Sequence, residues 1–265
     1  MPLFLDSRKR LERAVTHAEA FDSIWKSLIN PKSYETSIEV NADWTEGTAR
    51  FVHAPIPENN LALELGEMFY QLRASLDALV YKASVIAEKI DPPADQNRVE
   101  FPICAEPDRF KKSTINNSPF PQKIRDWIES IQPYNAAKTT NPELLAISTM
   151  LVLLHDCARK DRHRKLHIVA AVPTSVECGF DTYPGRVVSC HVVEGNLFEG
   201  KDEFLRFTLE GFKGAPGNIK LNSEVMVEVT IDEIPPLQSG HTRQIFNAIF
   251  QAVHVVIEQF EDWHK

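Results

Sequence analysis

The chain has 265 residues, of which 43% are hydrophobic and 25% are charged, and its formal net charge at pH 7 is -8. This composition is typical of a folded globular protein and excludes a largely disordered one. The acidic excess argues against a duplex DNA partner, because that binding needs many Lys and Arg contacts to phosphate. The N-terminal sequence lacks the apolar core of a signal peptide, and no apolar run approaches the ~20 residues that cross a bilayer. We therefore expect a cytoplasmic protein with no membrane partner.

The N-terminal part predicts one helix and then a β-hairpin. Apolar residues recur every three or four positions through residues 8–28, as on one face of a helix. Residues 34–40 and 48–53 have the composition of strands and are separated by turn residues. A hairpin within residues 34–54 is the prediction.

The strongest predicted helix covers residues 61–90. A continuous apolar stripe runs along it, and Asp91-Pro92-Pro93 ends it. The segment 91–140 is rich in proline, which leaves room for only one further helix, near residues 122–131. We expect this segment to wrap around the long helices.

Asn141 and Pro142 predict the start of the next helix, as N-cap and first helical residue, and this helix should cover residues 142–165. Four β-rich stretches follow within residues 168–231: 168–172, 187–193, 204–209 and 224–231. An amphipathic helix over residues 242–263 closes the chain.

These elements predict an α+β fold, in which a helical bundle of three to four long helices packs with one antiparallel β-sheet. The helical core is expected from residues 8–28, 61–90, 142–165 and 242–263, and both strand groups, 34–54 and 168–231, are expected to join the same sheet. We therefore predict a single domain over residues 1–265. Two independent subdomains are the alternative.

The four cysteines include no C-x-x-C pair and lie in apolar or strand-like contexts, so reduced and mostly buried thiols are expected. Cys157 lies near His155 and His163 in sequence. On one helix, however, its side chain points well away from both, which argues against a catalytic cysteine.

The stretch HDCARKDRHRKLH, residues 155–167, is the main candidate for a functional site, because it follows an apolar helical run directly. Helical spacing places Asp156, His163 and His167 on one edge of that helix, and His155, Asp161 and Arg162 on its apolar stripe. An Asp and an Arg on a core-facing stripe must pair or line a cavity.

The 61–90 helix carries a second polar edge, where Arg73 and Asp77 are spaced by one turn. If the two edges face each other, Arg73 and Asp77 should lie near residues 156–164. A His beside a carboxylate can act as a general base, and an Arg can hold an anion. We predict a catalytic group of His163, His167, Arg162, Asp161, Asp77 and Arg73, with substrate bound by Arg164, His155, Asp156 and Tyr81.

Four motifs resemble a large family of uncharacterised bacterial proteins. They are LRASLDALVY at 72–81, EFPI at 100–103, IQPY at 131–134 and DRHRKLH at 161–167, and they match in order and spacing over roughly residues 60–170. The resemblance implies no activity, but it marks Arg73, Asp77, Asp161, His163 and Arg164 as positions of interest.

Arg162 to His167 also has the R-x4-H form seen in HEPN-type ribonucleases, which are helical-bundle proteins. That resemblance implies that Arg162 and His167 attack RNA without a metal, often as a pair across a homodimer. The sequence thus predicts a hydrolase with a small-molecule or RNA substrate and no cofactor.

Two alternatives stay open. The same charges could form a structural ion-pair network in a non-catalytic binding or assembly module. Carboxylates and histidines of the bundle could instead hold a metal, although no Glu-x-x-His pair is present and we predict no metal ligand.

Overall fold

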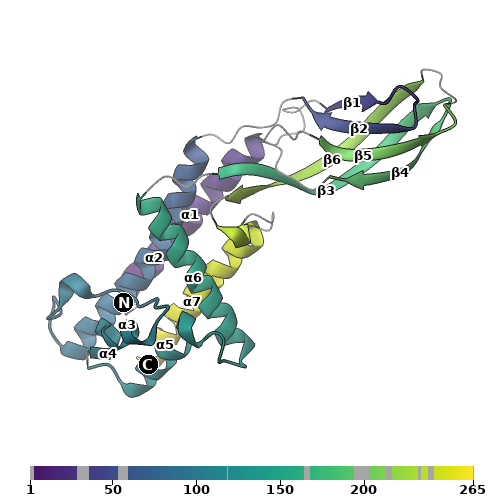
Figure 1. The fold of residues 1–265 in the computed structure, drawn as a ribbon. Coiled ribbons are helices and arrows are strands. Elements are labelled where there is room, and N and C mark those ends of the chain that lie inside the picture. The colour runs from purple at the N-terminus through teal and green to yellow at the C-terminus, as the bar shows by residue number, and fades with distance from the viewer. Residues whose placement is uncertain are drawn as a thin grey trace. The chain divides into compact units, whose positions relative to one another are not determined.

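The computed structural model describes residues 3–28, 36–52, 59–117, 119–163, 168–193, 203–212, 217–231, 234–237 and 242–264 (Figure 1). The chain divides into two compact units, each built from separated segments. Met1–Phe21, Leu63–Leu166 and Arg243–Lys265 form what we call the helical unit. Asp22–Ala62 and His167–Thr242 form the strand unit. The predicted α+β class is confirmed, while the single domain stays a prediction.

The four long helices are close to their predicted bounds. They are α1 (Leu5–Leu28), α2 (Asn59–Glu88), α6 (Pro142–His163) and α7 (Thr242–Trp263). Asn141 caps α6 as expected, because its side-chain oxygen accepts hydrogen bonds from the Glu143 and Leu144 amides. The apolar stripe of α2 is buried from Leu61 to Ala83, but Ile90 lies beyond the end of the helix and is exposed.

Aromatic rings join helices that are far apart in sequence. In the helical unit, Phe4, which directly precedes α1, packs edge-on against Phe260 of α7 at 6.2 Å between ring centroids. Phe69 of α2 meets Phe246 of α7 at 5.6 Å. Arg8 adds two hydrogen bonds to the Glu261 carboxylate. The core of this unit therefore draws on the N-terminal, middle and C-terminal segments together.

The proline-rich segment holds more helix than predicted. Besides α5 (Gln122–Ser130), it contains α3 (Pro107–Lys111), α4 (Thr114–Asn117) and two short 3-10 turns, η1 (Gln96–Arg98) and η2 (Pro133–Asn135). The prediction of a single helix here was wrong, because proline does not interrupt a helix when it occupies the first turn, as Pro107 does in α3.

The strand unit contains two antiparallel sheets. One has the order β1-β2-β5-β4, and the other pairs β3 with β6. The strands are β1 (Thr36–Val40), β2 (Glu46–Phe51), β3 (Ile168–Tyr183), β4 (Arg186–Val192), β5 (Glu203–Glu210) and β6 (Asn218–Ile231), and a 3-10 turn, η3 (Pro235–Leu237), follows. The N-terminal hairpin does join later strands, since Ala49 of β2 pairs with Leu205 of β5. The prediction of one common sheet was wrong for β3 and β6, which extend further than predicted and pair with each other.

Phe207, Leu209 and Phe212 form the buried centre of the strand unit. Phe180 of β3 packs against Phe207 at 4.9 Å between ring centroids, so residues of both sheets contribute to this core. The Phe207 ring lies directly over Gly47 of β2, where any Cβ atom would collide with it.

Candidate functional site

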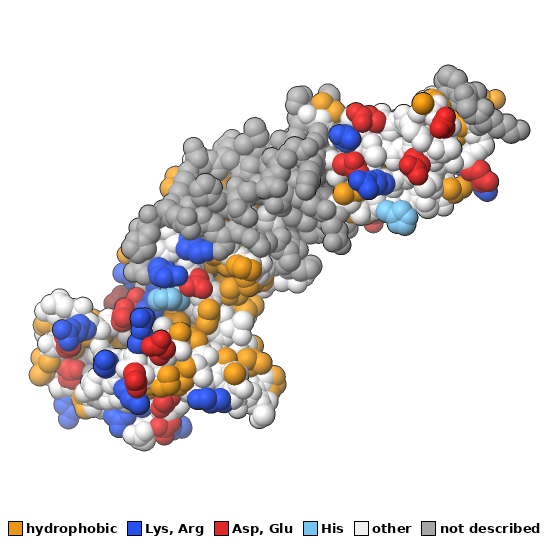
Figure 2. All heavy atoms as spheres, in the orientation of Figure 1, with side chains coloured by type: hydrophobic (Ala, Val, Ile, Leu, Met, Phe, Trp, Pro, Cys, Tyr) orange, Lys and Arg blue, Asp and Glu red, His pale blue; other side chains and the backbone are white. Residues whose placement is uncertain are grey.

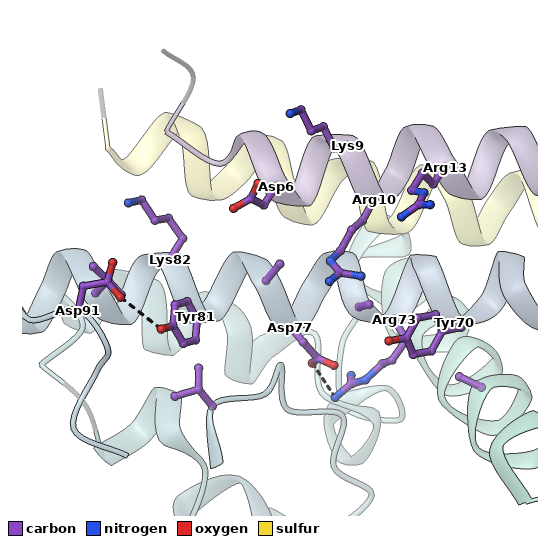
Figure 3. A pocket seen from close by; sticks show the side chains of 15 residues that line it. Asp6, Lys9, Arg10, Arg13, Tyr70, Arg73, Asp77, Tyr81, Lys82 and Asp91 are labelled. Carbon is purple, nitrogen blue, oxygen red and sulfur yellow. Dashed lines mark hydrogen bonds and ion pairs between the residues drawn. The ribbon is translucent and has the colours of Figure 1, made fainter. Parts of the chain in front are cut away.

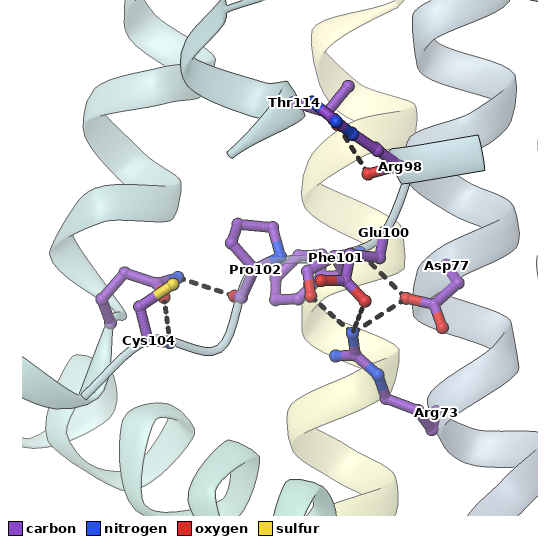
Figure 4. Close-up of polar contacts among 9 residues, drawn as sticks. Arg73, Asp77, Arg98, Glu100, Phe101, Pro102, Cys104 and Thr114 are labelled. Atoms are coloured by element: carbon purple, nitrogen blue, oxygen red, sulfur yellow. Dashed lines mark hydrogen bonds and ion pairs between the residues drawn. The ribbon is translucent and has the colours of Figure 1, made fainter. Parts of the chain in front are cut away.

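The best-defined polar cluster of the helical unit surrounds Arg73 of α2. The residue is 9% exposed, and its Nη2 donates a 2.7 Å hydrogen bond to the main-chain oxygen of Phe101 (Figure 4). The same nitrogen lies 3.1 Å from Asp77 Oδ1, one helical turn away. Asp77 Oδ1 in turn accepts the Phe101 amide at 2.9 Å. The Arg–Asp pair thus holds both main-chain groups of one residue.

Glu100 adds a weaker contact to this cluster. Its Oε2 lies 3.8 Å from Arg73 Nη2, and its side chain is 75% exposed. Arg73 Nη1 is buried and has no acceptor among the described residues. Because that donor is closed off from solvent, a ligand cannot reach it without rearrangement of the protein.

Gln132 forms hydrogen bonds with the segment that follows Phe101 and so helps to fix its position. This fully buried side chain donates to the main-chain oxygens of Pro102 and Ile128, at 3.0 and 2.9 Å, and accepts the Cys104 amide at 3.0 Å. Neither Gln132 nor Glu100 was predicted from the sequence as a site residue. Their only signal was membership of the IQPY and EFPI motifs.

Three of the four motifs therefore meet at one place. Arg73 and Asp77 come from LRASLDALVY, Phe101 and Pro102 from EFPI, and Gln132 from IQPY. The contacts fix an irregular stretch of main chain, residues 101–104, by satisfying its buried polar groups. The partners of Arg73 lie in residues 77–101 and not, as expected, in the described part of 156–164.

Asp161, near the C-terminal end of α6, packs against Gly66 of α2. A Cβ atom at position 66 would collide with the Asp161 carboxylate, so glycine permits this close approach of the two helices. Burial raises the pKa of the Asp161 carboxyl above its ordinary value, and the charge of Glu67 raises it further. A carboxyl with a raised pKa is a candidate for proton transfer.

Three further predicted site residues have different surroundings. His155 lines the pocket that also contains Arg73 and Asp77. Asp156 pairs with Arg159 of its own helix at 3.5 Å. Tyr81 donates a 3.3 Å hydrogen bond to Asp91, and its pKa is raised by desolvation and by that carboxylate.

The other four predicted residues cannot be placed. The backbone of Arg162 and His163 belongs to α6, but their side chains lie outside the described part of the chain. Arg164 and His167 lie outside it altogether. The structure therefore brings together Arg73, Asp77 and His155, and the predicted catalytic roles stay predictions.

A groove of about 770 Å³ runs between α1 and α2 (Figure 3). Its polar lining comes from both helices and from Asp91, which follows α2. It consists of five basic side chains (Lys9, Arg10, Arg13, Arg73, Lys82), three aspartates (Asp6, Asp77, Asp91) and two tyrosines (Tyr70, Tyr81). Arg10 extends from α1 toward α2, and Lys82 extends from α2 toward α1. Ala158 of α6 borders the same groove.

A second pocket, of about 980 Å³, lies on the other side of Arg73 and Asp77. Segment 94–104 and residues from α3 and α4 form most of its wall, and His155 of α6 contributes to it. Arg98, Arg109 and Lys112 are its further basic residues. Arg73 and Asp77 thus form part of the wall of both pockets.

Cys157 is fully buried, and burial raises the pKa of its thiol, so this residue has the properties of a core side chain and not of a nucleophile. Among the described residues, no group of three His, Cys, Asp or Glu side chains could hold a metal ion. None of the described helices is both long enough and apolar enough to cross a membrane.

Comparison of the chain with models of known protein families, with curated proteins and with solved structures finds no match. Its function must therefore be inferred from the residues of the groove and of the Arg73 cluster.

Proposed function

We propose that the helical unit is a binding module for single-stranded RNA and that the groove between α1 and α2 holds the strand. In this proposal α1, α2, α6 and α7 act as one helical bundle. The observation that carries it is the lining of the groove, where basic side chains outnumber acidic ones and two tyrosines lie among them.

The basic residues of the groove other than Arg73 are available to a ligand. Lys9, Arg13 and Lys82 are exposed, and no carboxylate among the described residues pairs with them. Within the part of the chain that the structure describes, the side chain of Arg10 makes only a 3.4 Å hydrogen bond to Gln71. Unpaired cations around one groove favour phosphate binding, because each phosphate contact releases a condensed counterion from the nucleic acid.

The tyrosines favour a single strand. Tyr70 is 48% exposed and Tyr81 is partly exposed. Aromatic rings beside a basic groove can stack on unpaired bases, and stacking is worth about 1–3 kcal/mol per base. A duplex offers no such free base faces. On the face of the helical unit drawn in Figure 2, moreover, basic side chains are interspersed with acidic ones and form no wide basic surface of the kind that binds duplex DNA.

The Arg73 cluster supports a binding module more than a catalytic centre. Arg73 and Asp77 both use their charges on the Phe101 main chain. We therefore assign them to positioning the wall between the two pockets, in agreement with the structural ion-pair network considered as an alternative for these charges.

Hydrolysis of the bound RNA is a second candidate, favoured by the position of Asp161. Ala158, which borders the groove, precedes Asp161 by three residues and the R-x4-H segment by four. In this version Arg162 and His167 cut the strand, Asp161 assists a proton transfer, and two copies of the chain complete the site as in HEPN-type ribonucleases.

RNA binding is tested by anisotropy of a fluorescent oligouridylate over a series of salt concentrations. We expect binding by the wild type, weaker binding by Arg13→Gln and Lys82→Gln, and a salt slope lowered by ~0.7 for each cation removed. Tyr70→Ala should weaken binding without changing the salt slope. Lys123→Gln on α5, outside both pockets, is the charge-matched control. Equal affinities for Arg13→Gln, Lys82→Gln and Lys123→Gln would contradict the proposal that the groove binds the RNA.

Cleavage is tested separately, by incubating the oligouridylate with wild type, Arg162→Ala, His163→Ala and His167→Ala in the presence of a chelator. The hydrolase version expects cleavage by the wild type, with loss in Arg162→Ala and His167→Ala, and a dimer in solution. Intact RNA in every sample, together with binding that depends on the groove residues, would reject the hydrolase version and support the binding module.

A further inference from the structure

Two cysteines of the strand unit lie side by side. Cys178 is on β3 and Cys190 on β4, and their Sγ atoms are 3.6 Å apart. Cys178 is partly exposed and Cys190 is exposed, so a dissolved oxidant can reach this pair. The expectation that the thiols are mostly buried holds for Cys104 and Cys157 and was wrong for these two.

The chain between the two cysteines explains their proximity. β3 ends at Tyr183, β4 begins at Arg186, and the Thr182 hydroxyl donates to the Gly185 main-chain oxygen across the short turn. The two strands therefore lie close together. Each nevertheless pairs with a different neighbour, β3 with β6 and β4 with β5.

We propose that Cys178 and Cys190 are a redox modification site, at which a peroxide or a disulfide oxidant forms a reversible internal disulfide. A disulfide has an S–S distance near 2.05 Å, so the sulfur atoms must approach by roughly 1.5 Å. Rotation about the side-chain torsion angles of the two cysteines can move the sulfur atoms by this distance. Disulfide formation needs no residue besides the two cysteines, and no group of three or more His, Cys, Asp and Glu side chains that could hold a metal ion occurs among the described residues.

The chemistry balances with hydrogen peroxide as the oxidant. The thiolate of one cysteine attacks a peroxide oxygen, the O–O bond breaks, a sulfenic acid forms and hydroxide leaves, taking up a proton to become water. The second thiolate then attacks the sulfenic sulfur, the S–S bond forms, and the sulfenic oxygen leaves as a second water. The two thiols lose two electrons and two protons, and the peroxide gains them.

The environments of the two thiols indicate which reacts first. Burial and the hydrogen bond with Cys190 raise the pKa of Cys178 to about 11, so little thiolate forms there at neutral pH. Cys190 is the more exposed of the two. The first attack on the oxidant comes from Cys190, and Cys178 resolves the sulfenic acid.

The bond would have a mechanical consequence for the strand unit, since it would join a strand of the two-stranded sheet to a strand of the four-stranded sheet. A cross-link that restricts the unfolded chain raises the melting temperature if it does not strain the folded state. In a reducing compartment the bond would be transient and would be reopened by thiol exchange.

The test uses the full chain, treated with oxidised glutathione or with dilute hydrogen peroxide and then denatured. Titration of free thiols should give four before treatment and two after it, since the chain has four cysteines. Trypsin cleaves after Arg186, which lies between the two residues, so a linked pair of peptides should appear in mass spectra without reductant and disappear with it.

Matched variants complete the experiment. Cys178→Ser and Cys190→Ser should each form no internal bond, and their melting temperature should not rise on oxidation. Cys104→Ser, which alters a buried thiol, should still lose two thiols on treatment. Four free thiols in treated wild type, a covalent dimer through Cys190 in place of the internal bond, or linkage of peptides other than these two would overturn the proposal.

Discussion

Arg73 and Asp77 show how a buried guanidinium is accommodated in the helical unit beside a partly exposed carboxylate. In place of water, the Arg73 guanidinium contacts the Asp77 carboxylate and the Phe101 main-chain oxygen. The carboxylate accepts a hydrogen bond from the Phe101 amide in addition to its contact with the guanidinium. Each charge therefore has a hydrogen-bonding partner besides the other charge. That arrangement is what makes a buried pair tolerable.

The cluster around Arg73 allows a prediction about stability. Asp77→Ala should lower the free energy of unfolding by about 1–3 kcal/mol, because it leaves the buried guanidinium of Arg73 and the Phe101 amide without that acceptor. The side chain of Asp77 is 35% exposed, which keeps the loss below that for a fully buried pair. Urea unfolding measures this value. Glu100→Ala is the control, since that distant and exposed carboxylate should contribute less than about 1 kcal/mol. Equal losses in both variants would contradict the assignment.

Asp161 gives a prediction about pH. Burial, aided by Glu67, raises the pKa of its carboxyl in the folded state above the unfolded value. The folded chain thus holds this proton to higher pH than the unfolded chain does. Its contribution to stability is complete below the unfolded pKa and is lost as the pH rises through the folded pKa. Asp161→Asn should therefore melt above the wild type at pH ~7, by a margin that shrinks toward pH ~3.

Asp156→Asn serves as the control for that experiment, because Asp156 is paired with Arg159 on the exposed side of the same helix. It should give no gain at neutral pH. A melting temperature of Asp161→Asn below that of the wild type at neutral pH would mean that this carboxylate is stabilised by its surroundings.

Segment 101–104 is held in place by hydrogen bonds without forming regular secondary structure. Its main-chain groups are bound by side chains from α2 and from just beyond the end of α5. The position of the second pocket depends on this segment, since Phe101 to Cys104 form part of its wall.

Gln132→Leu tests that dependence. The change keeps a side chain of similar size but leaves the buried Cys104 amide and the Pro102 oxygen without partners, so we expect a loss of about 2–4 kcal/mol. Chemical denaturation measures the loss. Gln122→Leu, the same substitution at an exposed position of α5, should cost far less. If the two variants unfold alike, Gln132 does not support the segment.

The long helices could be predicted because their signals are local. The stripe of α2, the Asn141 cap and the amphipathic pattern of α7 each lie within one segment. Pairing of β2 with β5 could not be predicted residue by residue, because nothing within either strand records its partner. The role of Gln132 was missed for the same reason, because two of its three hydrogen bonds are made to Pro102 and Cys104, about 30 residues earlier in the sequence.

Neither of the two units is formed by a continuous piece of sequence. Phe4, Phe69 and Phe260 of the helical unit come from three separate segments, and each is almost completely buried. We therefore expect residues 63–166, expressed alone, not to fold cooperatively, since Phe69 would lose Phe246 and the surfaces covered by α1 and α7 would meet water.

Circular dichroism during heating measures this directly. The full chain should lose its helical signal in a sigmoidal transition, and the fragment should show a weak signal with a gradual decline. A sharp transition in the fragment would show that the middle segment carries its own core.

The pairing of β2 with β5 has a consequence for synthesis. About 150 residues separate Ala49 from its partner Leu205, so the hairpin leaves the ribosome long before the strand that completes it. At roughly 5–20 residues per second, the outer edge of β2 waits on the order of ten seconds or more for that strand. Throughout this interval its main-chain groups are open to strands of other nascent chains. Slower translation would lengthen that exposure, and a chaperone that shields the edge would raise the yield of folded protein.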